Sequence, residues 1–260
     1  TFDGLVIPYW FYCKDRLQDK QPGPVIINIH GGPEAQERPM FSALDAYLAN
    51  QGFCIAAPNV RGSVGHGKHY HHLDDVEKRM DSVKDIEALV KHLVEEGKAD
   101  PKRIAVMGGS YGGFMTLASI TEYPQLWAAA VDIVGISNFE TFLTNTSKYR
   151  RAHRESEYGS LEEHRDILRA FSPIHKVERI VAPLMVIHGA NDPRVPVSEA
   201  EQIVNSLKCR GVPVKYLCYQ DEGHGLSKKK NQLDCFLQVA EFLKTYLGLK
   251  EEQRGELNGE

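Results

Sequence analysis

Residues 108–113 read Gly-Gly-Ser-Tyr-Gly-Gly, the pattern of a serine nucleophile in a tight turn. They follow the apolar run 103–107 and precede a helix-like run, which is the strand–turn–helix context that a Gly-x-Ser-x-Gly elbow requires. Gly108 and Gly112 lack the Cβ atoms that would clash where strand and helix approach closely. We therefore predict that the turn presents the Ser110 hydroxyl as a nucleophile for acyl transfer, rather than being a glycine-rich turn without chemistry.

A serine hydroxyl is a weak nucleophile, so it needs a base, and the base needs an acid to orient it. Asp192 follows the apolar run 184–187 and a glycine turn, which is the place of the acid in the α/β-hydrolase chain order. His224 stands between two glycines after the run 214–219, where the base is expected. Asp221 is a competing acid, but it lies only three residues from His224, so we prefer Asp192.

Catalysis of acyl transfer also needs N–H donors for the developing oxyanion. The N–H of Tyr111 opens the helix after the nucleophile and is one expected donor. The second is expected from the His-Gly-Gly-Pro loop after the apolar run 25–29, where Gly31 and Gly32 let the backbone approach a substrate. We interpret His30 as a residue that fixes this loop rather than as an acid or base.

A histidine-rich run offers a rival reading as a metal-dependent hydrolase. Histidines followed by aspartates are typical metal ligands, but no further ligand set stands at convincing spacing. We therefore favour surface or loop-packing histidines, and we expect no metal and no organic cofactor. The residues of this run are His66, His69, His71, His72, Asp74 and Asp75.

The elements that must position these residues alternate between short apolar runs and amphipathic segments. Several strand candidates are continuously apolar, as expected for parallel strands that are covered on both faces. The pattern predicts an α/β-hydrolase fold with a mostly parallel central sheet and helices on both faces. The expected strands are 5–12, 25–29, 53–57, 103–107, 128–134, 184–187 and 214–219, and the expected helices are 81–96, 114–121, 198–210 and 231–247.

One stretch, residues 144–176, interrupts this alternation because it is polar, long and rich in Arg, His and Glu. We interpret it as a helical excursion over the carboxyl edge of the sheet. The alternative is a solvated surface insertion that has no role in the site.

Composition bounds the function further. The 260 residues have a net charge of −4, which gives no electrostatic reason to expect a nucleic-acid partner, and no apolar run is long enough to span a bilayer. Residues 1–249 are expected to form one catalytic domain and 250–260 a polar tail. Five scattered cysteines without Cys-x-x-Cys spacing suggest reduced, buried thiols, and with no signal peptide they predict a cytoplasmic protein.

Four ordered motifs now resemble the catalytic domain of prolyl oligopeptidase family serine peptidases, with the acylaminoacyl peptidase branch as the best match. The motifs stand at 59–67, 108–113, 188–196 and 223–225, and the resemblance runs from about Gly4 to about Leu249. It implies Ser110, Asp192 and His224 as the catalytic triad, with oxyanion donors at Tyr111 and Gly32.

The resemblance also implies how a substrate is held. Arg194 matches a family arginine that binds a substrate carbonyl, although a salt bridge between loops would also explain it. An apolar pocket is expected to draw on Val134, Ile136, Phe139 and Val195.

Family members usually carry a β-propeller before this domain, and we expect none within this sequence, so the chain is either a catalytic domain cut from a longer protein or a stand-alone hydrolase. The resemblance favours a peptidase for oligopeptides or acylaminoacyl substrates, with a stand-alone carboxylesterase for small esters as the alternative. A catalytically silent binding module is a third reading, and a homo-oligomer is left open.

Overall fold

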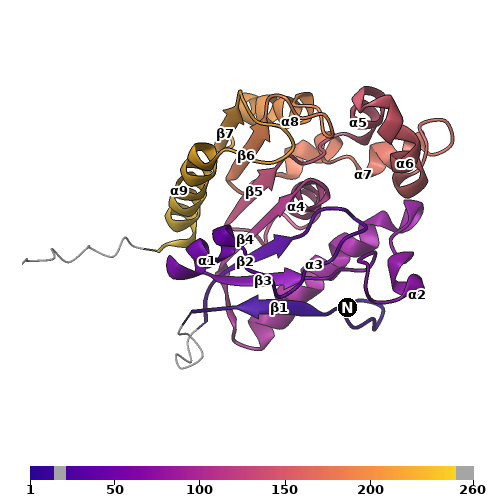
Figure 1. Cartoon of the computed structure of the whole chain (residues 1–260). Coiled ribbons are helices and arrows are strands. Elements are labelled where there is room, and N and C mark those ends of the chain that lie inside the picture. The colour runs from indigo at the N-terminus through magenta and orange to yellow at the C-terminus, as the bar shows by residue number, and fades with distance from the viewer. Residues whose placement is uncertain (15–21, 250–260) are drawn as a thin grey trace, which may run out of the picture.

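One mixed sheet forms the centre of the computed structural model, which describes residues 1–14 and 22–249. The strand order is β1-β3-β2-β4-β5-β6-β7 (Figure 1). Strand β1 pairs with β3 antiparallel, and every other neighbouring pair is parallel, which confirms the predicted mostly parallel sheet. The strands are β1 (Tyr9–Tyr12), β2 (Gly23–Ile29), β3 (Cys54–Pro58), β4 (Ala99–Gly109), β5 (Ala129–Ile133), β6 (Leu184–Gly189) and β7 (Val214–Tyr219).

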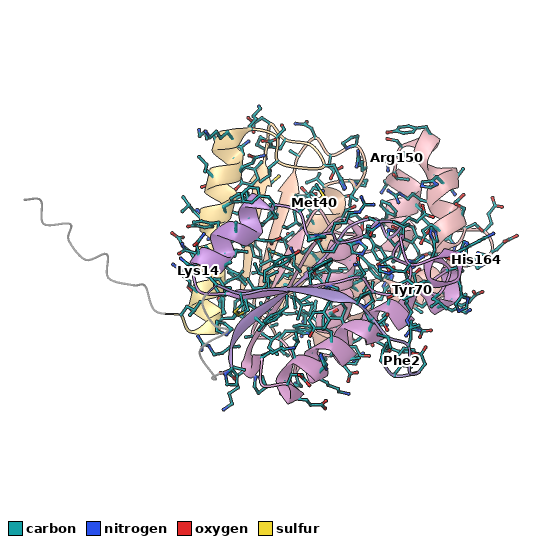
Figure 2. All side chains as sticks on the ribbon, turned by 60° about the horizontal axis from the view of Figure 1, so that its bottom comes forward. Phe2, Lys14, Met40, Tyr70, Arg150 and His164 are labelled. Carbon is teal, nitrogen blue, oxygen red and sulfur yellow. A yellow bond between two sulfur atoms is a disulfide. The ribbon has the colours of Figure 1, made fainter. Side chains whose placement is uncertain are left out.

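Helices cover both faces of this sheet, as predicted. One buried cluster joins the sheet to α3, α4 and α8, and a second cluster joins the opposite face to α1 and α9. Figure 2 shows the side chains filling the space between sheet and helices. The helices are α1 (Ala43–Asn50), α2 (Lys68–His71), η1 (Val76–Lys78), α3 (Arg79–Glu95), α4 (Tyr111–Glu122), α5 (Phe139–Asn145), α6 (Lys148–Tyr158), α7 (Arg165–Phe171), η2 (Pro173–Arg179), α8 (Ser198–Cys209) and α9 (Lys229–Leu247).

The excursion predicted for residues 144–176 is helical. Between β5 and β6 the chain forms α5, α6, α7 and the 3₁₀ segment η2, and Figure 1 shows α5, α6 and α7 grouped at one side of the molecule. Within residues 1–14 and 22–249, no helix combines the length and the apolar character that crossing a bilayer would require. The tail that we expected at 250–260 lies outside the described residues.

The expectation that all five cysteines are reduced is wrong for two of them. The antiparallel pairing of β1 with β3 places Cys13 opposite Cys54, and their sulfur atoms are bonded. A separation of 41 residues hides this neighbourhood in the sequence. Cys209, Cys218 and Cys235 are free, but only Cys235 is buried. The cytoplasmic location, which rested partly on the cysteines, stays a prediction.

Candidate active site

Ser110 occupies a strained turn between β4 and α4, as the glycine pattern predicted. Its backbone angles are φ 59° and ψ −115°, a region that non-glycine residues rarely adopt. The turn is held from the neighbouring strand, because the Ser110 N–H donates to the Ile133 carbonyl of β5 at 2.8 Å. The strand and the helix on either side of Ser110 hold its strained backbone in place. The fixed backbone in turn sets the direction of the Ser110 side chain.

The glycines of the turn are required by close backbone approach. A Cβ on Gly112 would overlap the Ile29 carbonyl oxygen at the end of β2, and a Cβ on Gly108 would overlap the Gly112 carbonyl. Any larger residue at either place must push strand and helix apart. The predicted role of both glycines is thus confirmed.

Asp192 and His224 come together across 32 residues of sequence. Both follow parallel strands, β6 and β7, which are neighbours in the sheet, so their loops meet at the same carboxyl edge. His224 Nδ1 donates to Asp192 Oδ2 at 2.7 Å. The Asp192 side chain is fully buried, while the His224 side chain is 16% exposed. Asp221 instead pairs with Lys228 and Asn231, which favours Asp192 as the acid.

The contacts of Asp192 keep it charged. Burial raises the pKa of this carboxyl, but the hydrogen bond and charge of His224 and two backbone N–H donors outweigh burial, so the pKa is lowered. Those donors are Arg194 at 2.7 Å and Val195 at 3.0 Å, both to Oδ1. Fully buried His188 donates from Nε2 to the Val195 carbonyl at 3.0 Å and so steadies the same loop.

The nucleophile is connected to this pair only through the fold. Strands β4 and β6 flank β5 and run parallel, so Ser110 lies at the edge where Asp192 and His224 stand. Among the described side chains, none makes a hydrogen bond to Ser110 Oγ. Such bonds are often long in the absence of substrate and tighten only in the reacting complex.

The predicted oxyanion loop lies directly against the nucleophile. A Cβ on Gly31 would stand 3.5 Å from the Ser110 Cβ and 3.0 Å from the Gly109 carbonyl oxygen. His30 fixes the loop, as interpreted: its Nδ1 donates to the Gly31 carbonyl at 2.7 Å and its Nε2 lies 2.9 Å from Ser63 Oγ. Burial lowers the pKa of His30, which keeps this imidazole neutral.

The helical excursion is attached to loops on both sides of Ser110. Thr146 and Ser147, between α5 and α6, donate to the carbonyls of Arg194 and Pro193 at 3.2 and 3.1 Å. From the middle of α6, Arg154 donates to the Gly32 carbonyl at 3.3 Å. Helix α6 thus bridges the acid loop and the oxyanion loop. These contacts favour the excursion over the carboxyl edge, whereas the alternative of a surface insertion with no role in the site stays untested.

The Tyr111 side chain points away from the reacting edge into a buried polar cluster. Its hydroxyl lies 3.2 Å from Arg79 Nη1 and 3.3 Å from Asp74 Oδ2. Arg79 also pairs with Asp74 and Glu157 at 2.5 and 2.6 Å, so the guanidinium compensates these buried carboxylates. Only the backbone N–H of Tyr111 is left for a role in the site.

The structure does not assemble the histidine run into a metal centre. Within the described residues, the side chains close enough to share an ion are Asp74, Asp75 and Glu157, and no histidine is among them. His71 and His72 pair instead with carboxylates, at 3.2 and 2.8 Å. The two aspartates of the run thus lie together with Glu157, and its histidines do not join them.

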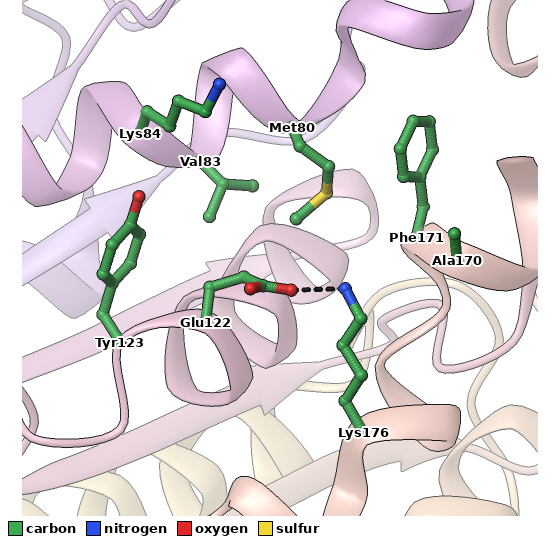
Figure 3. A pocket seen from close by; sticks show the side chains of 8 residues that line it. All are labelled: Met80, Val83, Lys84, Glu122, Tyr123, Ala170, Phe171 and Lys176. Atoms are coloured by element: carbon green, nitrogen blue, oxygen red, sulfur yellow. Dashed lines mark hydrogen bonds and ion pairs between the residues drawn. The ribbon is translucent and has the colours of Figure 1, made fainter. Parts of the chain in front are cut away.

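The four apolar residues expected to line a substrate pocket are buried, with at most 5% of each exposed. Phe139 packs edge-on against Phe114, with ring centres 4.9 Å apart, so these side chains form a wall of the core. A groove of about 230 Å³ lies elsewhere, between α3, the end of α4 and α7, beside the Glu122–Lys176 ion pair (Figure 3). None of the predicted site residues lines this groove, including the four apolar residues Val134, Ile136, Phe139 and Val195.

Three buried carboxyl groups near the site escaped the sequence analysis. Asp132 lies behind the nucleophile turn, Glu199 accepts N–H bonds from Ser137 and Asn138, and Glu222 precedes His224 by two residues. Acidic residues usually lie at the surface, and no local pattern marked these three as buried. Only the adjacency of Glu222 to the Gly-His-Gly segment gave a signal that could have been used.

Comparisons with known proteins agree with this geometry. The sequence profile of the Prolyl oligopeptidase family matches residues 39–250. The chain is 38% identical over 233 residues to Dipeptidyl peptidase family member 6 of Caenorhabditis elegans, covering 87% of this chain and 32% of that protein. It is 35% identical over 240 residues to Dipeptidyl aminopeptidase BIII of Pseudoxanthomonas mexicana, covering 90% and 35%.

A solved structure extends the likeness to three dimensions. The acylaminoacyl peptidase of Pyrococcus horikoshii superimposes with a TM-score of 0.85 at 26% identity, over 96% of this chain and 41% of that chain. The α/β-hydrolase fold predicted from the motifs is therefore confirmed. The chain spans about a third of the length of the curated relatives that it matches.

Proposed function

The chain belongs to the prolyl oligopeptidase family, and we propose that it is a serine hydrolase that cleaves peptide or acyl-amide bonds through an acyl-enzyme on Ser110. The observation that carries this proposal is the 2.7 Å bond from His224 to buried Asp192, at the sheet edge where the strained Ser110 turn stands. The relatives that the chain resembles are named as peptidases, which favours amide over ester substrates.

In the proposed reaction these three groups act in sequence. His224 Nε2 accepts the proton of Ser110 as the hydroxyl attacks the substrate carbonyl, while Asp192 holds the Nδ1–H and stabilises the imidazolium. The imidazolium then protonates the leaving group, and an acyl-enzyme remains. Water, deprotonated by His224, releases the acyl group and restores Ser110.

The backbone supplies the electrostatic stabilisation in this proposal. The N–H groups of Tyr111 and Gly32, with Gly31 beside them, bind the oxyanion of the tetrahedral intermediate. The contact between Gly31 and the Ser110 turn supports this assignment, and Arg154 steadies the loop through the Gly32 carbonyl.

Substrate binding is assigned to the acid loop and to the wall beside it. Arg194 is exposed, lies two residues after Asp192 and donates its backbone N–H to that acid, and we assign its guanidinium to binding a substrate carbonyl. The substrate residue before the scissile bond would lie against the apolar wall of Val134, Ile136, Phe139 and Val195.

Replacing Ser110 with Ala tests the reaction. We expect turnover of a p-nitrophenyl ester and a peptide p-nitroanilide to fall by about 10⁴-fold or more, because the covalent step is lost. Ser206→Ala, at a half-buried serine of α8, is the matched control and should keep wild-type rates. Wild-type activity in a folded Ser110→Ala protein would refute the nucleophile.

The choice between peptidase and carboxylesterase depends on relative rates. We expect measurable kcat/KM on the peptide anilide as well as on the ester. Turnover of esters with no detectable anilide cleavage would support the esterase instead. If folded protein neither turns over these substrates nor reacts with a fluorophosphonate, the silent binding module is the better reading.

A further inference from the structure

The loop that carries His224 is loosely packed around the two glycines that flank this residue. It joins β7 to α9, and a Cβ on Gly225 would meet no atom within 4 Å. A Cβ on Gly223 would come no nearer than 3.8 Å to another residue. Leu226 packs against the buried cluster on the α1 and α9 face, but the two glycines that flank the imidazole make no such close contact.

Glu222 spans both ends of this loop. Its Oε2 accepts the N–H and the hydroxyl of Ser227, each at 2.9 Å. Its Oε1 accepts the Lys228 N–H at 2.9 Å and the Asn231 side-chain amide at 2.8 Å. The side chain is only 2% exposed, so one buried carboxylate closes the five-residue segment 223–227.

The backbone of Glu222 also holds the acid loop. Its carbonyl accepts the Asn191 N–H at 3.0 Å, one residue before Asp192. Gly189 ends β6, and a Cβ on this residue would overlap the Gly223 carbonyl. The two loops are therefore in direct backbone contact. Glu222 is therefore the residue through which the loops of acid and base are joined.

The donors around Glu222 favour its ionised form. Its pKa is lowered to about 2, first by the Ser227 N–H, with the Asn231 amide and the Lys228 N–H adding to it against the effect of burial. A carboxylate that accepts several N–H bonds is fully charged at neutral pH. All four donors are thus satisfied at once only by the ionised side chain.

We infer that Glu222 is a positioning residue for His224: its carboxylate closes the base loop and keeps the imidazole in register with Asp192. The inference rests on the proposed function, because it assigns His224 the role of base. The competing view is that Glu222 merely stabilises the start of α9 and does not affect catalysis.

The variant Glu222→Gln separates these views, with Asp221→Asn as the matched control. Glutamine keeps the shape but offers N–H donors where two of the four bonds need an acceptor. Asp221 is the neighbouring acid and is exposed, and its side chain also contacts Lys228 and Asn231. Unlike Glu222, it makes no hydrogen bond to the backbone of segment 223–228 in the described structure. Both variants lose one negative charge from the same loop.

We expect kcat for a p-nitrophenyl ester to fall about tenfold or more in Glu222→Gln, because a base displaced by about 1 Å loses much of its effect. KM should stay within about twofold of wild type, since Glu222 does not face the substrate. Fluorophosphonate should label Ser110 at a proportionally lower rate but reach the same final stoichiometry. Asp221→Asn should match wild type within about twofold.

A kcat for Glu222→Gln within about twofold of that for Asp221→Asn overturns the inference. A fall in labelling stoichiometry that accounts for all of the lost kcat also overturns it, because the folded fraction then reacts at the wild-type rate. If Glu222→Gln does not fold, Ser227→Ala removes one of the four bonds, and it should slow labelling at full stoichiometry. An unchanged labelling rate in that variant also overturns the inference. Failure of wild type and Asp221→Asn to react at all would instead count against the proposed function.

Discussion

The nucleophile side and the base side of this site hold their buried carboxyl groups in opposite ways. Behind the Ser110 turn, Asp132 of β5 is buried among Gly113 and Gly135, and neither of its oxygens has a hydrogen-bond partner of good geometry in the described structure. Burial raises its pKa to about 7, although the nearby Gly135 N–H opposes this. Glu222 is as inaccessible but has four donors, and its pKa is about 2.

This difference shows what holds each side. The nucleophile turn is fixed by shape, through backbone hydrogen bonds and missing Cβ atoms, and it tolerates a carboxyl group that is easily neutralised. The base loop is held mainly by charge, because one carboxylate joins its two ends, in addition to the core contact of Leu226 and the close approach of Gly189. The number of donors, and not burial alone, decides whether a buried acid is ionised.

Adding one methyl group is expected to have very different effects on the two sides. Gly112→Ala forces a Cβ into the Ile29 carbonyl, so we expect the free energy of unfolding to fall by about 3 kcal/mol or more. Gly225→Ala meets open space, and its free energy of unfolding should change by less than about 1 kcal/mol. Urea unfolding measures both. Equal losses in the two variants would contradict the view that the serine turn is closely packed whereas the glycine after His224 is not.

The second prediction concerns Asp132. The pKa of Asp132 is about 7 in the folded protein and 3.8 in the unfolded chain. As pH rises from about 4 to 7, Asp132 ionises in the unfolded chain but stays protonated in the folded one, so the free energy of unfolding of wild type falls. Asp132→Asn removes that loss. Between pH 4 and pH 8 the variant should gain roughly 4 kcal/mol in free energy of unfolding relative to wild type. Parallel stability curves for the two proteins over this range would mean that Asp132 ionises freely in the folded state.

The smallest effect is expected at Glu222, in the opposite direction and in another pH window. Its folded pKa is depressed from 4.5, so its stabilisation is complete above pH 4.5 and is lost as pH falls toward 2. Glu222→Gln should therefore lose less stability than wild type across this acid range. Acid unfolding followed by circular dichroism measures the slopes, and a steeper loss in the variant would count against an ionised Glu222.

The sequence could predict the parts of the site that depend on chain order. A strained serine turn, an acid after β6 and a base after β7 follow from motif and strand periodicity, and the structure bears out the turn and the Asp192–His224 contact. Strand ends were less accurate. Strand β1 begins at Tyr9 rather than at residue 5. Helix α3 begins at Arg79 rather than at the predicted residue 81, because the 3₁₀ turn η1 leads directly into it.

What could not be predicted depends on distances between segments far apart in the chain. The bond between Cys13 and Cys54 needs the β1–β3 pairing, and the burial of Asp132 needs two glycines from different elements. The attachment of α6 to both loops likewise follows from its position and not from its polar composition. Such contacts leave no periodic signal in a single sequence.

Peptide mapping after reaction with a fluorophosphonate tests the central claim most directly. The account predicts one phosphonyl group per chain, located on Ser110, with loss of ester and anilide turnover in proportion to labelling. It also predicts that His224→Ala abolishes the reaction. Label on another residue in inactivated protein, or full labelling of Ser110 without His224, would contradict a nucleophile activated by the His224–Asp192 pair.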